Sequence, residues 1–170
     1  MRVATSWTIP GTRETIWPLL CHSYMTRKRS CLFCLGIPRP KQCRLSSGSG
    51  GVGQGRECVS EEGTIRQRIL EWEEERRLRF QMEETDFAFR RCISSLVDTF
   101  ELERLGASKT RVTRTTDVGI RGPLRWVKAM PIWFGLKLVH RFVFRNWADT
   151  AATAVTLASA PPPSKRKAIF

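Results

Sequence analysis

The stretch from residue 138 to residue 152, LVHRFVFRNWADTAA, decides the fold class of this chain. It is too apolar for an ordinary surface helix and too charged to span a membrane. On a helical wheel its apolar arc covers roughly half of the circumference or more, which suits a helix held in the hollow of a bent sheet. The central stripe is Ile132, Leu136, Val139, Val143 and Trp147, flanked by Trp133, Phe144 and Ala151, with Lys137, Arg141, Arg145 and Asp149 opposite.

The helix that contains this stretch is expected to begin near Pro131 and to run to about Thr153. Proline is tolerated in the first turn of a helix, where its missing N–H has no intrahelical partner to lose. His140 falls within the apolar arc. Two interpretations stay open for it: a hydrogen-bonded structural histidine at the flank of the helix, or a group that contacts a ligand.

Alternating apolar and polar residues predict several β-strands, of which TIRQRILEWE and RRLRFQM form a hairpin around the polar turn 73–76. With an even loop, Ile69 faces Phe80 on one side of the hairpin. The same register places Glu71 on that oily face and Trp72 opposite Arg77 on the other face. A slip of one residue would move each of these side chains to the opposite face. Further strands are predicted at 3–9, 41–46, 56–60, 96–105 and 109–119.

Short connections between successive strands predict an antiparallel sheet, and with it an α+β chain rather than a doubly wound one. Two short helices are expected after the first strand. One lies in GTRETIWPLLCH, where Gly11 and Thr12 can cap it and Pro18 shortens or kinks it, and the other lies within 23–40. The length of 170 residues suits one domain, assigned to residues 1–158. Residues 159–170 form a basic, proline-containing tail that is expected to be disordered.

The net charge of +13 divides along the chain into +7 for residues 1–60, −5 for 61–103 and +11 for 104–170. Because the excess is spread and no nucleic-acid-binding motif accompanies it, a basic solvated exterior is favoured and nucleic acid is an unlikely partner. The KRK cluster at 165–167 leaves a weak contact with an anionic membrane surface open. No secretory signal is visible, so a soluble, cytoplasmic protein is expected.

Six cysteines are expected to be thiols, because the core is large enough to need no disulfides. Cys31 and Cys34 have zinc-knuckle spacing, and Cys43 and the pair Cys21 and His22 are further potential ligands. A second CxxC or HxxxH is missing, so scattered free cysteines are favoured and no metal is expected. The glycine-rich stretch 48–53 indicates a flexible turn rather than a dinucleotide site, and no cofactor is expected.

The order of these segments resembles the SRPBCC superfamily. It comprises an opening strand, ETIWPLL, GVGQGREC, the hairpin IRQRILEWEEERRLRF, the pair DTFELE and TRVTRTT, and finally LVHRFVFRNWADTAA. Within the superfamily the sequence is most similar to the polyketide cyclase/dehydrase and lipid-transport group, which is related to START domains and the birch pollen allergen. The resemblance covers residues 3–152 and rests on segment order and the pattern RxxEWxxxRRLxF, with Glu74 and Glu75 where relatives often carry proline. It implies a helix-grip fold, in which an antiparallel sheet wraps the C-terminal helix and encloses a pocket.

The expected function follows from that pocket, which would take a small hydrophobic ligand such as a lipid or a polyketide-like compound. An alternative is a cyclase or dehydratase acting in the same cavity, with Glu71 or His140 as the acid or base. A third is an interaction protein that binds nucleic acid or an anionic membrane. The candidate ligand-binding residues are Phe80, Phe100, Trp133, Leu136, His140, Phe144 and Glu71, with Asp98 and Arg114 as further polar candidates.

Overall fold

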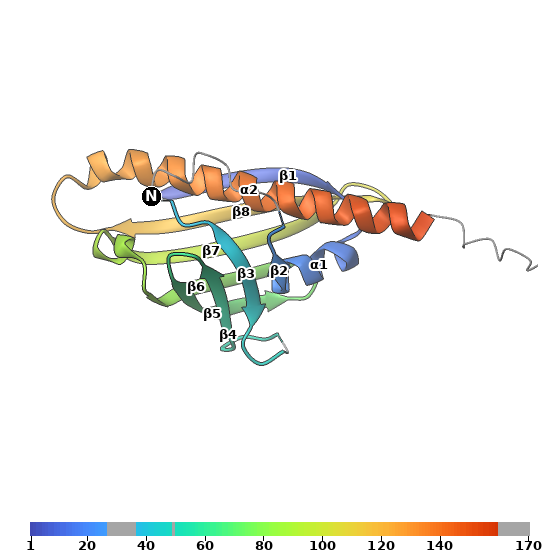
Figure 1. The fold of residues 1–170 in the computed structure, drawn as a ribbon, viewed down its shortest axis with the longest axis horizontal. Helices are drawn as coiled ribbons and strands as arrows, with labels where there is room; N and C mark the ends of the chain where they lie inside the picture. Colours follow the sequence, from blue (N-terminus) through green and yellow to red (C-terminus); the bar gives the residue numbers. More distant parts are fainter. Residues whose placement is uncertain (27–36, 49, 160–170) are drawn as a thin grey trace, which may run out of the picture.

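The structure is a computed structural model of the 170-residue chain, and it describes residues 1–26, 37–48 and 50–159. In this part of the chain, successive strands are interrupted by a short helix after the first strand and followed by a long helix, as the sequence predicted (Figure 1). The strands are β1 (Arg2–Pro10), β2 (Ser23–Tyr24), β3 (Pro40–Leu45), β4 (Gly55–Ser60), β5 (Thr64–Glu73), β6 (Arg77–Thr85), β7 (Ile93–Arg104) and β8 (Lys109–Ile120). The helices are α1 (Arg13–Cys21), the 3₁₀ turn η2 (Ala88–Arg91) and α2 (Arg125–Ser159).

All the strands join one antiparallel sheet in the order β1-β8-β7-β6-β5-β4-β3-β2. Because every pair is antiparallel, short hairpin connections suffice for most neighbours, and the first strand forms one edge of the sheet by pairing with the last strand. Helix α2 lies along the sheet and packs mainly on β1, with further contact to β8 and α1 (Figure 1). The α+β class and the helix-grip arrangement are therefore confirmed.

The main core lies between the second half of α2 and the inner face of the sheet. Val143, Phe144, Trp147 and Ala151 are all buried there, at the spacing that the helical wheel predicted. Each large apolar side chain contributes about 1.5–3 kcal/mol when fully buried, so this half of the helix holds the sheet firmly. The sheet supplies Ile9, Ile69, Leu78, Phe80, Phe100, Leu102 and Val112.

Helix α2 is longer at both ends than the predicted span from Pro131 to Thr153. It begins at Arg125, so Pro131 lies inside the helix rather than in its first turn. The added N-terminal residues include Trp126 and Met130, which are 73% and 77% exposed. These apolar side chains face water instead of the core. The first turns of the helix therefore lack a buried apolar stripe at helical spacing, and the sequence pattern did not predict them.

A β-bulge changes the predicted register of the β5–β6 hairpin. Ile69 does pair with Phe80, but the register shifts between Ile69 and Glu71, so that Glu71 pairs with Arg79 and Trp72 with Leu78. The predicted opposition of Trp72 and Arg77 is therefore wrong. The extra residue turns the Glu71 side chain to the outer face and Trp72 to the inner face, because side chains alternate with a period of two.

Trp72 consequently packs in the core against Trp17 of α1, with ring centroids 5.0 Å apart. The indole also lies against the backbone at Gly50, where an added Cβ would come within 1.9 Å of the ring. The glycine-rich connection before β4 is thus needed for close approach to an aromatic side chain.

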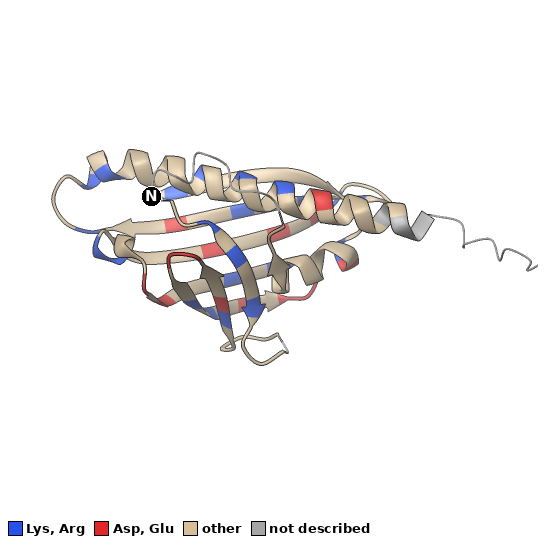
Figure 2. Ribbon diagram, in the orientation of Figure 1, with Lys and Arg blue, Asp and Glu red and all other residues tan. Residues whose placement is uncertain are grey.

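The first short helix, α1, is present and includes Pro18. The second short helix was expected within 23–40, and most of that segment lies outside the described residues. None of the helices in the described part of the chain combines the length and apolar character needed to cross a bilayer. Figure 2 shows Lys and Arg positions along α2, and basic and acidic positions interspersed over the strands.

Candidate ligand-binding cavity

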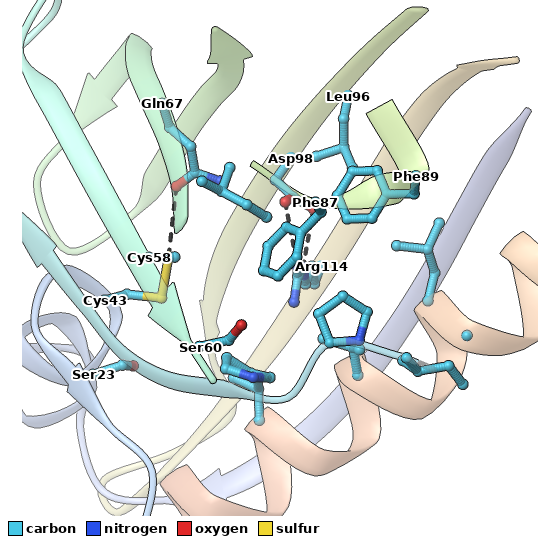
Figure 3. Close-up of a pocket in the computed structure, with 18 of the residues that line it drawn as sticks. Ser23, Cys43, Cys58, Ser60, Gln67, Phe87, Phe89, Leu96, Asp98 and Arg114 are labelled. Atoms are coloured by element: carbon cyan, nitrogen blue, oxygen red, sulfur yellow. Dashed lines mark hydrogen bonds and ion pairs between the residues drawn. A yellow bond between two sulfur atoms is a disulfide. The ribbon is translucent and has the colours of Figure 1, made fainter. Parts of the chain in front are cut away.

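A cavity of about 330 Å³ lies between the inner face of the sheet and α2 (Figure 3). Helix α2 lines it with residues between Pro131 and Trp147, among them Ile132 and Gly135. The strands that contribute lining residues are β2 to β8, and Phe87 and Phe89 come from the connection between β6 and β7.

The lining is mostly apolar, and part of it was predicted. Phe80 of β6, Phe100 of β7 and Leu136 of α2 all line the cavity. Phe80 and Phe100 stack with ring centroids 5.8 Å apart, so they form one continuous aromatic wall. Apolar walls of this kind with a few polar groups are typical of sites for small hydrophobic molecules.

The polar part of the lining includes Asp98 and Arg114, whose side chains point toward each other in Figure 3. Arg114 donates from Nε to Asp98 Oδ1 at 3.0 Å and from Nη2 to Asp98 Oδ2 at 2.9 Å. Thr116 donates a further hydrogen bond to Asp98 Oδ1. Burial alone would raise the pKa of Asp98, but the Arg114 charge and these hydrogen bonds hold it below the ordinary value. Asp98 is therefore an ionised, fully engaged carboxylate.

His140 belongs to the same network but does not line the cavity. Thr116 gives its hydroxyl hydrogen to Asp98, so His140 Nε2 donates to Thr116 Oγ1 at 2.9 Å. The other ring nitrogen, Nδ1, lies 3.1 Å from Thr5 Oγ1 and accepts from it. Burial and the nearby Arg114 lower the pKa of His140 to about 3, so the ring is neutral and both nitrogens are used. The structural interpretation of His140 fits this geometry.

Arg56 of β4 also lines the cavity, and its side chain is buried, with 4% of the residue exposed. Its Nη1 donates to Gln67 Oε1 at 2.6 Å, and its Nη2 donates to the Leu20 carbonyl at 3.2 Å. The guanidinium carbon lies 4.5 Å from the centre of the Phe80 ring. Burial lowers the pKa of Arg56 to about 10, with the nearby charge of Arg114 acting in the same direction, so Arg56 is still protonated at neutral pH.

The structure corrects the expectation of free thiols for one pair of cysteines. Cys43 and Cys58 are directly opposite each other on β3 and β4 and form a disulfide. Both residues line the cavity, and Cys58 Sγ lies 3.7 Å from Gln67 Oε1 (Figure 3). Strand pairing brought together two residues 15 positions apart, which spacing alone could not indicate. Cys21 and Cys92 are free.

The zinc-knuckle pair Cys31 and Cys34 lies outside the described residues. Within the described ranges no group of three His, Cys, Asp or Glu side chains is placed to hold a metal ion. Of the further potential ligands, Cys43 forms the disulfide with Cys58 and Cys21 is buried.

Three further candidates do not line the cavity. Trp133 is 46% exposed, because it lies on the outer flank of the wide apolar arc of α2. Phe144 is fully buried in the main core and packs edge-on against Trp147, with ring centroids 5.9 Å apart. Glu71 lies on the outer face of the sheet, where it pairs with Arg77 at 2.8 Å and Arg79 at 2.7 Å. The hydrogen bond from Arg79 is the main reason why the pKa of Glu71 is lowered.

Several lining residues were not predicted, and Arg56 and Gln67 are the most informative. An arginine in a short strand usually faces water, and nothing in RECVS distinguishes a buried arginine from an exposed one. The inward position of Gln67 could have been predicted, since it lies two residues before the inward-facing Ile69 on the same strand. Phe87 and Phe89 follow the end of β6, where no periodicity could place them.

Comparison with solved structures shows the same fold in several proteins. The Zhui aromatase/cyclase from a Streptomyces strain superposes with a TM-score of 0.68 at 13% identity, covering 95% of this chain and 99% of that one. A START superfamily protein from Mycobacterium smegmatis gives 0.63 at 12% identity, covering 90% and 98%. Norcoclaurine synthase from Thalictrum flavum, solved in complex with dopamine and hydroxybenzaldehyde, gives 0.56 at 14% identity, covering 95% and 89%. These similarities show the START-like helix-grip fold that the sequence resemblance implied.

No protein-family model and no curated protein sequence matches the chain.

Proposed function

We propose that the protein binds a small, largely hydrophobic molecule in the cavity between the sheet and α2, and carries or presents it. The observation that supports this most directly is the cavity itself, about 330 Å³ in volume and lined mainly by apolar side chains. Among proteins with the same fold, norcoclaurine synthase is solved with dopamine and hydroxybenzaldehyde, and another is named an aromatase/cyclase. The lipid or polyketide-like nature of the ligand is part of the proposal.

Binding is a better proposal than catalysis for this chain. The two residues put forward as acid or base, Glu71 and His140, do not line the cavity. Asp98 does, but a carboxylate held by Arg114 and Thr116 with a lowered pKa is a weak base. A cyclase or dehydratase acting in the same cavity is the alternative, and detection of turnover on a bound compound would favour it.

Gly135 offers a way to test the proposal without weakening the fold. It lies within α2, is buried, and lines the cavity, where an added Cβ would lie 3.6 Å from Ile37. A larger side chain at this position occupies cavity space, while replacement of a helical glycine gains about 0.5–1 kcal/mol of helix stability. Gly135→Leu should therefore block the cavity in a folded protein, and Gly135→Ala is the matched control with nearly the same backbone effect.

The probe is N-phenylnaphthylamine, an uncharged dye whose fluorescence rises in apolar surroundings. We expect the wild type and Gly135→Ala to bind it with similar affinity, and Gly135→Leu to bind it about tenfold or more weakly. Native mass spectrometry of the purified wild type should in addition detect a hydrophobic compound that is lost from Gly135→Leu. Equal dye binding by all three proteins, or no binding by the wild type, would contradict the proposal.

A further inference from the structure

The cavity carries an uncompensated positive charge. Among the described residues that line it, Arg56 and Arg114 are the cations and Asp98 is the one acid. Asp98 is held by both ends of the Arg114 guanidinium, so its charge is already matched. The charge of Arg56 has no such match.

The contacts of Arg56 are all with uncharged groups. In the described part of the chain its hydrogen-bond partners are the Gln67 amide oxygen, the Leu20 carbonyl and Cys58 Sγ, the last at 3.0 Å from Nη1. Its Nε is buried and has no hydrogen-bond partner among the described residues. The face of the Phe80 ring attracts the cation but cannot neutralise it.

A buried charge without a counter-charge is unfavourable when no ligand occupies the cavity. Burying an ion costs several kcal/mol even after relaxation, and that cost is recovered when an opposite charge with good hydrogen-bond geometry is present. Proteins usually avoid the cost by placing the arginine at the surface or by supplying a carboxylate, as they do for Arg114. A guanidinium that lines an apolar cavity without a counter-charge is suited to an anionic ligand group, since a carboxylate is a stronger acceptor for its N–H donors than the uncharged oxygens it now contacts.

We propose that the ligand of this cavity is a hydrophobic acid, ionised at neutral pH, whose anionic group pairs with Arg56 while its apolar body lies along Phe80 and Phe100. This inference rests on the proposed ligand-binding function and adds the chemical class of the ligand. It also assigns distinct roles to the two arginines, since Arg114 is occupied by Asp98 and Arg56 is the group that selects for negative charge.

Decanoate and decanol are a suitable pair of probes because they share one chain and differ in the charged end. Each would be measured by its displacement of N-phenylnaphthylamine from the wild type, Arg56→Met and Arg68→Met. Methionine retains an unbranched apolar stem like the one of arginine, and replacement of a buried ion by an apolar residue is often tolerated. Arg68 is exposed on the neighbouring strand β5, so Arg68→Met removes the same charge from the outer surface and controls for general attraction of anions.

We expect the wild type and Arg68→Met to bind decanoate more tightly than decanol. Arg56→Met should lose about tenfold to a hundredfold in affinity for decanoate and less than about threefold for decanol. Arg56→Lys, which retains the charge but has fewer donors, should lie between the two. Equal loss for both probes, or no loss for decanoate, would overturn the inference.

The result separates this inference from the proposed function. If the dye itself does not bind, or is not excluded by Gly135→Leu, the cavity is not a binding site and both proposals fail. If the dye binds but decanoate and decanol displace it equally well from the wild type, the cavity binds hydrophobic molecules and only the preference for an acid is wrong. This last comparison uses the wild type alone, so it decides the question even if Arg56→Met does not fold.

Discussion

The two arginines of the cavity differ in what surrounds them. Arg114 on β8, whose side chain is 13% exposed, belongs to a network with Asp98, Thr116 and His140, in which both carboxylate oxygens of Asp98 and both ring nitrogens of His140 have partners. Arg56 on β4 is more completely buried but donates only to uncharged acceptors. The network of Arg114 links the sheet to α2. The charge of Arg56, in contrast, is left available to pair with a ligand of opposite charge. Burial of a charged residue therefore does not by itself indicate function, whereas the presence or absence of its counter-charge does.

The largest expected effect comes from breaking the closed network at Asp98. In Asp98→Asn, Arg114 keeps its partly buried charge and loses its counter-charge, which should lower the free energy of unfolding by about 3–5 kcal/mol. The measurement is urea denaturation followed by circular dichroism.

The control for this prediction removes both charges. Asp98→Leu combined with Arg114→Met should recover most of the stability, because no uncompensated ion is left. A double variant as unstable as the single one would show that the ion pair is not the reason.

The disulfide beside Arg56 should have the next largest effect. Cys43 and Cys58 are 15 residues apart, and the loss of a cross-link that closes a loop of this size costs about 3 kcal/mol. Denaturation with and without a reductant measures the effect, and mass spectrometry counts the free thiols. Cys43→Ala with Cys58→Ala, which has no bond to reduce, should show no response to the reductant. A wild type that is equally stable in both conditions would contradict the prediction.

The network around His140 predicts a loss of stability in mild acid. In the folded protein, burial and the charge of Arg114 lower the pKa of this ring from 6.5 to about 3. Between these two pH values the histidine is therefore protonated in the unfolded chain and neutral in the folded chain. The contribution of neutral His140 to the free energy of unfolding is complete above pH 6.5. It is lost as the pH falls toward 3, at up to about 1.4 kcal/mol per pH unit. At pH 5 the loss should be about 2 kcal/mol.

Comparison with His140→Gln isolates this contribution. The variant lacks the titrating ring, so its free energy of unfolding should change less between pH 7 and pH 5 than that of the wild type. The lowered pKa of Asp98 acts at lower pH, because a carboxylate of this kind stabilises the fold until the pH falls through its own range. Parallel curves for the two proteins between pH 7 and pH 5 would show that another group is responsible.

The smallest effect is expected for Arg56 in the empty protein. Arg56→Met removes an uncompensated buried charge but also leaves the Gln67 and Leu20 oxygens without their donor. The two consequences oppose each other, so the free energy of unfolding should change by less than about 1 kcal/mol. A loss comparable to that of Asp98→Asn would mean that Arg56 is a structural residue like Arg114.

The sequence predicted those parts of the fold in which periodicity and burial agree. Val143 and Trp147 repeat at helical spacing on the buried face of α2, and the strands from β3 onward alternate as expected. Periodicity failed where burial is absent, as in the exposed first turns of α2. It failed again at the β5 bulge, because LEWE fits alternation in either register and only the pairing with β6 decides between them.

The candidate site was less predictable than the fold. Phe80, Phe100 and Leu136 line the cavity because core and cavity use the same apolar side chains, and the same reason explains why Phe144 was misplaced. Arg56 depends on the position of β4 in the folded sheet, and the Cys43–Cys58 bond depends on how β4 pairs with β3. Neither can be derived from local sequence.

The bulge in β5 also has a consequence for how related chains should be aligned. Leu70 is the additional residue, so a relative without it would continue the ladder with Ile69 and Trp72 still facing inward. A one-residue gap therefore belongs at this point, in the middle of a strand, and not in the neighbouring loops where gaps are usually placed. An alignment that forces the gap into the turn would exchange inner and outer positions between the bulge and the turn, and would assign the core position of Trp72 to the outward-facing Glu71.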